Sequence, residues 1–129
     1  MDLLAQAATL AAAAIHAWFF VLETLWFERP SVHGRFGLTT PEEVGTVRSW
    51  AFNQGFYNLF LAAAAVIGVG LVAAGSVDAG RAVILVACGS MVAAGVVLVA
   101  HDRWFARAAA IQALPPLVAI VGLLISQPQ

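Results

Sequence analysis

The chain has 129 residues, of which 62% are hydrophobic and only 10% are charged, and its formal net charge is −1. A soluble domain is about 45–50% apolar and about 25% charged, so this composition indicates a small membrane protein. The low net charge gives no electrostatic basis for binding nucleic acid. The single cysteine, Cys88, excludes an intrachain disulfide.

Four apolar stretches, each long enough to cross a bilayer, follow one another along the chain. Only helices and closed barrels satisfy the backbone in lipid, and these stretches lack the period-2 alternation of barrel strands. The sequence therefore predicts an all-α membrane protein, an up-down bundle of four transmembrane helices in one domain over residues 1–129. The predicted spans are residues 3–27, 50–74, 82–100 and 108–126. The N-terminus lacks the basic residues of a signal peptide, so we expect the first span to be retained.

The longest connection, residues 28–49, contains a helix start signal. Thr40 can cap a helix, Pro41 suits its first position, and Glu43 completes a capping box. The second helix is therefore expected to begin before the membrane, or to follow a short helix that is broken near Gly45. The two other connections are short, as in an up-down bundle.

The placement of arginine predicts the orientation of the spans. All six basic residues are arginines; five flank the first and third connections, and Arg81 alone marks the second. The positive-inside rule then places the long first loop and the third connection in the cytoplasm, with both termini outside.

Polar side chains from every span lie toward the predicted cytoplasmic end, whereas the outer half is almost entirely apolar. An unpaired buried amide costs about 1–3 kcal/mol, so these groups are expected to converge inward on a polar pocket. The candidate residues are His16, Glu23, Asn53, Gln54, Tyr57, Asn58, His101, Asp102 and Gln112.

Glu23 is the strongest candidate for chemistry, because an ionisable group inside a span is a functional hypothesis by default. We predict that it acts as a general acid or base, with Asp102 or His101 as the counter-group. The structural alternative for Glu23 is a position at the membrane interface or an ion pair with an arginine such as Arg48 or Arg107. The alternative for His101 and Asp102 is solvation at a helix end.

The remaining polar residues are predicted to bind and orient a substrate. On the second helix, Asn53, Gln54, Tyr57 and Asn58 recur at the spacing of neighbouring turns, which predicts one shared face, although amides also hold membrane helices together. Gln112 is placed in the same group, and Gly55 would allow another helix or a ligand to approach closely.

His16 is predicted to belong to this binding group as well, with a buried core histidine as its structural alternative. No clustered cysteines or paired histidines at metal-ligand spacing occur, so neither a metal nor a cofactor is predicted. Haem bound through His16 is retained as a minor alternative.

Three segments, Phe19–Trp26, Asn53–Ala62 and Gln112–Pro115, resemble a family of small bacterial membrane proteins catalogued as domain of unknown function 1304. Leu59 and Ala113 stand where this family is expected to carry glycine, a difference that concerns local packing. The resemblance implies a four-helix, multi-pass protein of the bacterial inner membrane. It implies no activity.

The residues themselves favour an enzyme that acts on a lipophilic small molecule by acid–base chemistry, through isomerisation, cyclisation or epoxide opening. No serine or cysteine lies with the polar group, so a covalent nucleophile is not expected. Two alternatives stay open: a small proton-coupled exporter of lipophilic compounds, and a membrane scaffold or accessory subunit. The expected partners are the lipid bilayer, the lipophilic molecule and, through glycine-rich faces, further copies of the chain.

Overall fold

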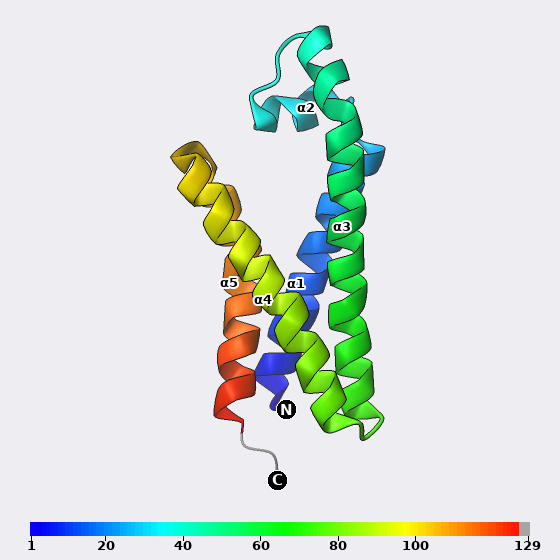
Figure 1. Ribbon diagram of the computed structural model, residues 1–129, viewed down its shortest axis with the longest axis vertical. Coiled ribbons are helices and arrows are strands. Elements are labelled where there is room, and N and C mark those ends of the chain that lie inside the picture. Colours follow the sequence, from blue (N-terminus) through cyan, green and yellow to red (C-terminus); the bar gives the residue numbers. More distant parts are fainter. Residues whose placement is uncertain (127–129) are drawn as a thin grey trace. The chain divides into compact units, whose positions relative to one another are not determined.

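The computed structural model describes residues 1–126, and these residues form helices with no strand among them (Figure 1). The elements in chain order are α1 (Leu3–Phe20), the π-helix η1 (Val21–Leu25), α2 (Pro30–His33), the 3₁₀ helix η2 (Gly34–Phe36), α3 (Pro41–Ala73), α4 (Val77–His101), the 3₁₀ helix η3 (Arg103–Phe105) and α5 (Ala106–Ile125).

Four helical segments are long and apolar enough to cross a membrane, which confirms the four predicted spans. The protein is therefore an all-α membrane protein. The segments are Leu3–Leu25, Pro41–Ala73, Val77–His101 and Arg103–Ile125. At about 1.5 Å per residue, a span needs only about 20 residues, so α3 is longer than a bilayer requires.

The predicted capping box does start α3. The Thr40 hydroxyl accepts from the Glu43 amide at 3.3 Å, and the Glu43 carboxylate accepts from the Thr40 amide at 3.0 Å and from the Thr39 amide at 2.9 Å. The alternative of a helix broken near Gly45 is wrong, because α3 continues without interruption through that residue. The long connection before α3 is also partly helical, since it contains α2 and η2.

The chain divides into two compact units. The first consists of residues 1–15 together with the chain from Leu61 onward, and the second is His16–Phe60.

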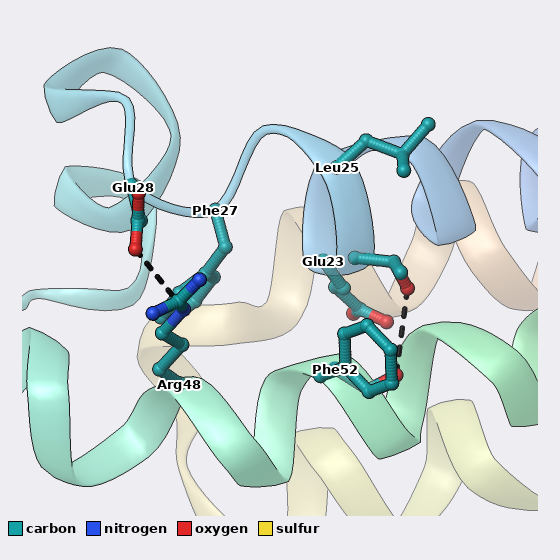
Figure 2. Close-up of a pocket in the computed structure, with 7 residues that line it drawn as sticks. Glu23, Leu25, Phe27, Glu28, Arg48 and Phe52 are labelled. Carbon is teal, nitrogen blue, oxygen red and sulfur yellow. Dashed lines mark hydrogen bonds and ion pairs between the residues drawn. The ribbon is translucent and has the colours of Figure 1, made fainter.

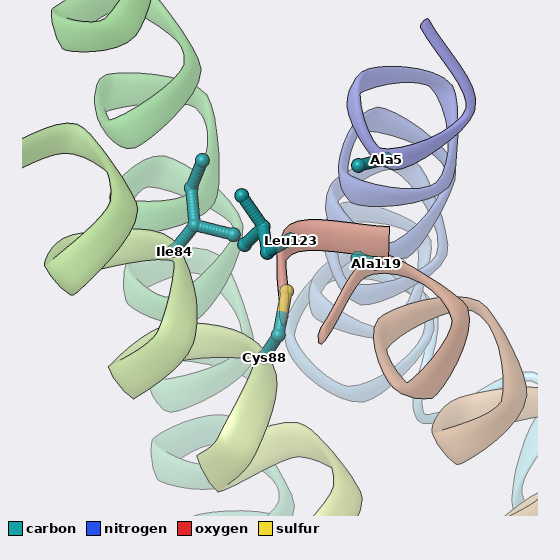
Figure 3. Close-up of a cluster of buried hydrophobic side chains, with 5 residues drawn as sticks. All are labelled: Ala5, Ile84, Cys88, Ala119 and Leu123. Carbon is teal, nitrogen blue, oxygen red and sulfur yellow. The ribbon is translucent and has the colours of Figure 1, made fainter. Parts of the chain in front are cut away.

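In the first unit, parts of all four long helices pack around one apolar cluster. Figure 3 shows Leu123 of α5 lying against Ile84 and Cys88 of α4, with Ala5 of α1 and Ala119 beside them; all five residues are fully buried. From α3, Val69 and Val72 pack against the cluster. Since lipid tails are as apolar as these side chains, close van der Waals packing holds such helices together in a membrane.

Small residues allow the helices of this unit to approach closely. A Cβ added to Gly80 of α4 would lie 2.6 Å from the carbonyl oxygen of Gly68 on α3. A Cβ on Gly122 of α5 would lie 2.9 Å from the Cβ of Ala5 on α1. The backbones therefore meet at distances that larger residues would prevent.

A polar network closes one end of the first unit. Asp2 caps α1 by accepting from the Ala5 amide at 2.7 Å, and its other oxygen accepts from the Ser126 hydroxyl at 2.8 Å. Arg81 donates to the carbonyl oxygens of Ser126 and Leu123 at the end of α5. The network thereby links the beginnings of α1 and α4 to the end of α5.

Candidate functional site

The second unit contains a helical hairpin in which η1 packs along the first half of α3. In η1 the Trp26 amide donates to the Val21 carbonyl oxygen, five residues back, at 3.0 Å, which is the hydrogen bond of a π-helix. The Thr24 hydroxyl donates to the Phe52 carbonyl oxygen of α3 at 3.4 Å. Single-turn π-helices are rare and recur at functional sites, and Glu23 lies in the middle of this one.

Gly55 is a position at which η1 and the end of α1 approach α3 closely. A Cβ there would collide with the Thr24 hydroxyl and would lie 3.3 Å from both the Glu23 Cβ and the Phe20 carbonyl oxygen. The absence of a side chain on Gly55 thus allows Glu23 to lie directly against α3. The close helix approach predicted at this glycine is confirmed.

Glu23 is held by a neutral amide on the facing helix. The Asn58 Nδ2 donates to the Glu23 Oε2 at 2.8 Å. Asn58 is buried, with 5% of its surface exposed, and Glu23 is partly buried. The alternative prediction, an ion pair between Glu23 and Arg48, is wrong, because Arg48 forms its ion pair with Glu28.

A small pocket opens beside this pair, with a volume of ≈ 110 Å³ (Figure 2). Ligand pockets commonly reach about 300–1,000 Å³, so this one has room for the polar end of a molecule and not for a whole lipophile. It is lined by Glu23, Thr24, Leu25, Phe27, Glu28, Arg48 and Phe52.

The Glu28 and Arg48 side chains form an ion pair at the wall of the pocket, with 3.0 Å between Arg48 Nε and Glu28 Oε1. Both side chains are about two-thirds exposed, at 64% for Arg48 and 65% for Glu28. The pocket thus combines a partly buried carboxyl group with an exposed cation.

The other polar residues predicted on α3 do not share a buried face with Asn58. Asn53, Gln54 and Tyr57 are exposed, whereas Asn58 is buried on the same side as Ala51. The expectation that all four converge on one inward face is therefore wrong. Of the four, Asn58 alone contacts Glu23 through a hydrogen bond that the structure records.

His16 is completely buried near the end of α1. Its ring packs edge-on against Phe19, with 5.6 Å between ring centroids. It is not one of the residues that line the pocket beside Glu23.

His101, Asp102 and Gln112 belong to the first unit. Asp102 caps η3 by accepting from the Trp104 amide at 2.9 Å, and His101 is exposed at the end of α4. The Gln112 side chain donates to the Met91 carbonyl oxygen at 3.4 Å and so joins α5 to α4. Each of these contacts is structural in kind, and the roles of counter-group and substrate ligand stay predictions.

Within residues 1–126, no three His, Cys, Asp or Glu side chains gather closely enough to hold a metal ion. The sequence interpretation missed Thr24, Glu28 and Phe52 as pocket residues, and it considered Arg48 only as a structural partner. No comparable signal marked those residues, although the packed face of α3 was marked: Ala51 and Gly55 are small residues one turn apart, and Asn58 follows on the same side.

Comparison with known proteins identifies a family. The family model described as "Protein of unknown function (DUF1304)" matches residues 10–124, a range that includes the whole hairpin and both members of the Glu23–Asn58 pair. No curated protein and no solved structure matches the chain. The match names no activity, so any function has to be argued from the site.

Proposed function

The chain belongs to the DUF1304 family of proteins of unknown function, and from the site itself we propose that it is a membrane-embedded enzyme. Its reaction is a proton transfer on a lipophilic small molecule, with Glu23 as the acid and base. Asn58 is a positioning residue that acts through the Glu23 carboxyl group.

One observation carries the proposal: the recorded partner of the Glu23 carboxyl is a neutral amide, at 2.8 Å. An amide donates through its N–H groups and accepts through its carbonyl oxygen, so Asn58 can bond to an ionised carboxylate and, after rotation, to a protonated one. An arginine would favour only the ionised form. The pair is therefore suited to a carboxyl group that gives and takes a proton.

The simplest reaction for such a site is an isomerisation. The Glu23 carboxylate removes a proton from the carbon between a carbonyl group and a C=C double bond; the C–H electron pair forms a new C=C bond, and the π pair of the old double bond moves to its far carbon. The protonated Glu23 then returns the proton to a different carbon of the same molecule. The carboxylate is regenerated, no atoms are gained or lost, and no co-reactant is required. General acid–base catalysis of this kind contributes about 10²–10⁴-fold to a rate.

The size and surroundings of the pocket support a lipophilic substrate. The polar part of the molecule fits the ≈ 110 Å³ space beside Glu23, and the remainder lies against the apolar helices. We further propose that the protein resides in the bacterial inner membrane, with the connection that contains α2 in the cytoplasm. The arginines that flank this connection and the third one support that orientation.

The test is isotope exchange in heavy water. Purified wild-type protein, Glu23→Gln and Glu42→Gln are each incubated with a total bacterial lipid extract, and mass spectrometry detects carbon-bound deuterium. Glu42 is a matched control, because it is an exposed carboxylate at the start of α3 and does not line the pocket.

We expect one lipophile to gain deuterium with the wild type and with Glu42→Gln, at a rate about 10²-fold or more above that with Glu23→Gln. Equal incorporation of deuterium with the wild type and with Glu23→Gln would show that Glu23 takes no part in the reaction. A Glu23→Gln protein that fails to fold would instead make the carboxyl group structural.

A further inference from the structure

The Arg48–Glu28 ion pair is easily opened. Both side chains are about two-thirds exposed, at 64% and 65%, and exposed pairs of this kind contribute little to stability. The recorded bond involves the Nε of Arg48, and a guanidinium has five N–H donors in a planar fork. An incoming anion can therefore take the place of Glu28 at Arg48 with little loss.

The ligand that matches a guanidinium is a carboxylate or a phosphate, since both can accept two parallel N–H bonds from it. Arg48 lines the same pocket as Glu23, so an anion bound at Arg48 would lie in the proposed reaction site. In Figure 2, Arg48 and Glu28 lie at one end of the pocket, and Glu23 and Phe52 lie at the other.

A row of phenylalanines leads away from this pocket along α3. Phe52 lines the pocket and packs against Phe56, with 5.2 Å between ring centroids; Phe56 in turn packs against Phe60 at 6.2 Å. The spacing of four residues keeps the rings on one side of the helix, and the row extends over about 12 Å. Phe52 and Phe60 are 51% and 61% exposed, so the row is an accessible apolar surface continuous with the pocket.

We propose that the substrate is a single-chain amphiphile with an anionic head, a carboxylate or a phosphate. The inference rests on the proposed function and names the substrate class for that same site. The head binds Arg48, displacing Glu28, and the hydrocarbon chain lies along Phe52, Phe56 and Phe60. Seven residues of α3, or about 10 Å, separate Arg48 from Gly55, where Glu23 packs. Glu23 therefore acts on a carbon several atoms from the head.

The test is a binding titration followed by native mass spectrometry of the full-length protein in a non-ionic detergent. The probes are palmitic acid, hexadecyl phosphate and methyl palmitate, which is the neutral counterpart of palmitic acid. The variants are Arg48→Gln, Glu28→Gln and, as a matched control, Arg35→Gln; Arg35 is an exposed arginine of η2, in the connection before α3, and it donates to the Ser31 carbonyl oxygen.

We expect Arg48→Gln to weaken the binding of the anionic probe about tenfold or more, because a charge-assisted hydrogen bond is lost. Glu28→Gln should tighten it several-fold, since the competing carboxylate is gone. Arg35→Gln should match the wild type, and methyl palmitate should bind weakly to every variant. Opposite effects of the two pocket variants cannot arise from misfolding. The comparison between palmitic acid and hexadecyl phosphate identifies which anion the site takes.

Equal losses with Arg48→Gln and Arg35→Gln, or binding of methyl palmitate as tight as that of palmitic acid, would overturn the proposal. Displacement of the anionic probe by phosphatidylglycerol, a two-chain anionic lipid, would overturn it too, because the site would then bind ordinary bilayer lipids. Glu23→Gln should still bind the anionic probe. Probe binding without deuterium exchange in the wild type would contradict only the proposed function, and exchange without a requirement for Arg48 would contradict only the substrate class.

Discussion

The Glu23–Asn58 hydrogen bond makes a quantitative prediction about stability. Replacing Asn58 with leucine removes the amide donor and keeps a side chain of similar size at a position that is 5% exposed. Hydrogen bonds to charged groups contribute about 1.5–3 kcal/mol in soluble proteins. Double-mutant cycles in a membrane protein average about 0.6 kcal/mol, with a maximum of about 1.7. Where these ranges meet, the expected loss of unfolding free energy is about 1.5 kcal/mol.

Making Asn58→Leu in a protein that already carries Glu23→Leu separates the contribution of the hydrogen bond from the general effect of replacing Asn58. In Glu23→Leu the acceptor is absent, and replacing both partners with apolar groups is close to neutral. Asn58→Leu should therefore cost almost nothing in that background, which gives a coupling free energy of about 1.5 kcal/mol between the two positions. The assay is reversible unfolding in mixed detergent micelles, followed by circular dichroism.

The matched control is Asn53→Leu, the same substitution on the exposed side of α3. It should show no coupling to Glu23→Leu, because Asn53 lies on the other side of the helix from the pair. An equal cost of Asn58→Leu in the wild-type and Glu23→Leu backgrounds would refute the hydrogen bond as the link between η1 and α3.

Two further predictions concern packing and pH. Gly55→Ala should lower the unfolding free energy by about 1–3 kcal/mol through overpacking against η1, whereas Gly45→Ala, with open space around it, should raise it by up to about 1 kcal/mol. The same unfolding assay measures both, and equal effects would contradict the close approach at Gly55. Bonds from the Ala5 amide and the Ser126 hydroxyl lower the pKa of Asp2 below its ordinary value of 3.8. Asp2 therefore stabilises the fold above pH 3.8, and this contribution is lost as the pH falls through the lowered pKa. The thermal unfolding midpoints of the wild type and Asp2→Asn should converge as the pH is lowered. A difference between the two midpoints that does not change with pH would refute the link between the ionisation of Asp2 and stability.

The four spans and the start of α3 could be predicted because both depend on local sequence. Continuous hydropathy identifies a membrane helix without reference to its neighbours, and the Thr40–Glu43 capping box is complete within four residues. The rotation of α3 about its own axis, which decides which of its residues face η1, could not be predicted in this way. Its membrane part is apolar on all sides, so hydropathy does not distinguish the side of Asn58 from that of Asn53 and Tyr57.

The partner of Glu23 depends on a contact between segments far apart in the chain. Asn58 is 35 residues from Glu23, and Arg48 is drawn to Glu28 because the hairpin brings those two residues together. The sequence placed Glu23 and Asn58 in one polar group but offered arginines as the structural partner of Glu23. Close packing at Gly55, a position that the sequence did suggest for a close helix approach, brings Glu23 against the side of α3 that carries Asn58.

We propose that Glu23 exchanges a proton while Asn58 stays its hydrogen-bond partner. Infrared difference spectroscopy across a pH titration observes the carboxyl C=O stretch directly in the protein embedded in lipid. We expect a titrating carboxyl band that is absent in Glu23→Gln and shifted in frequency in Asn58→Leu, with Asn53→Leu identical to the wild type. A titrating band that is unchanged in Asn58→Leu, or spectra in which Glu23→Gln removes no titrating band, would contradict it.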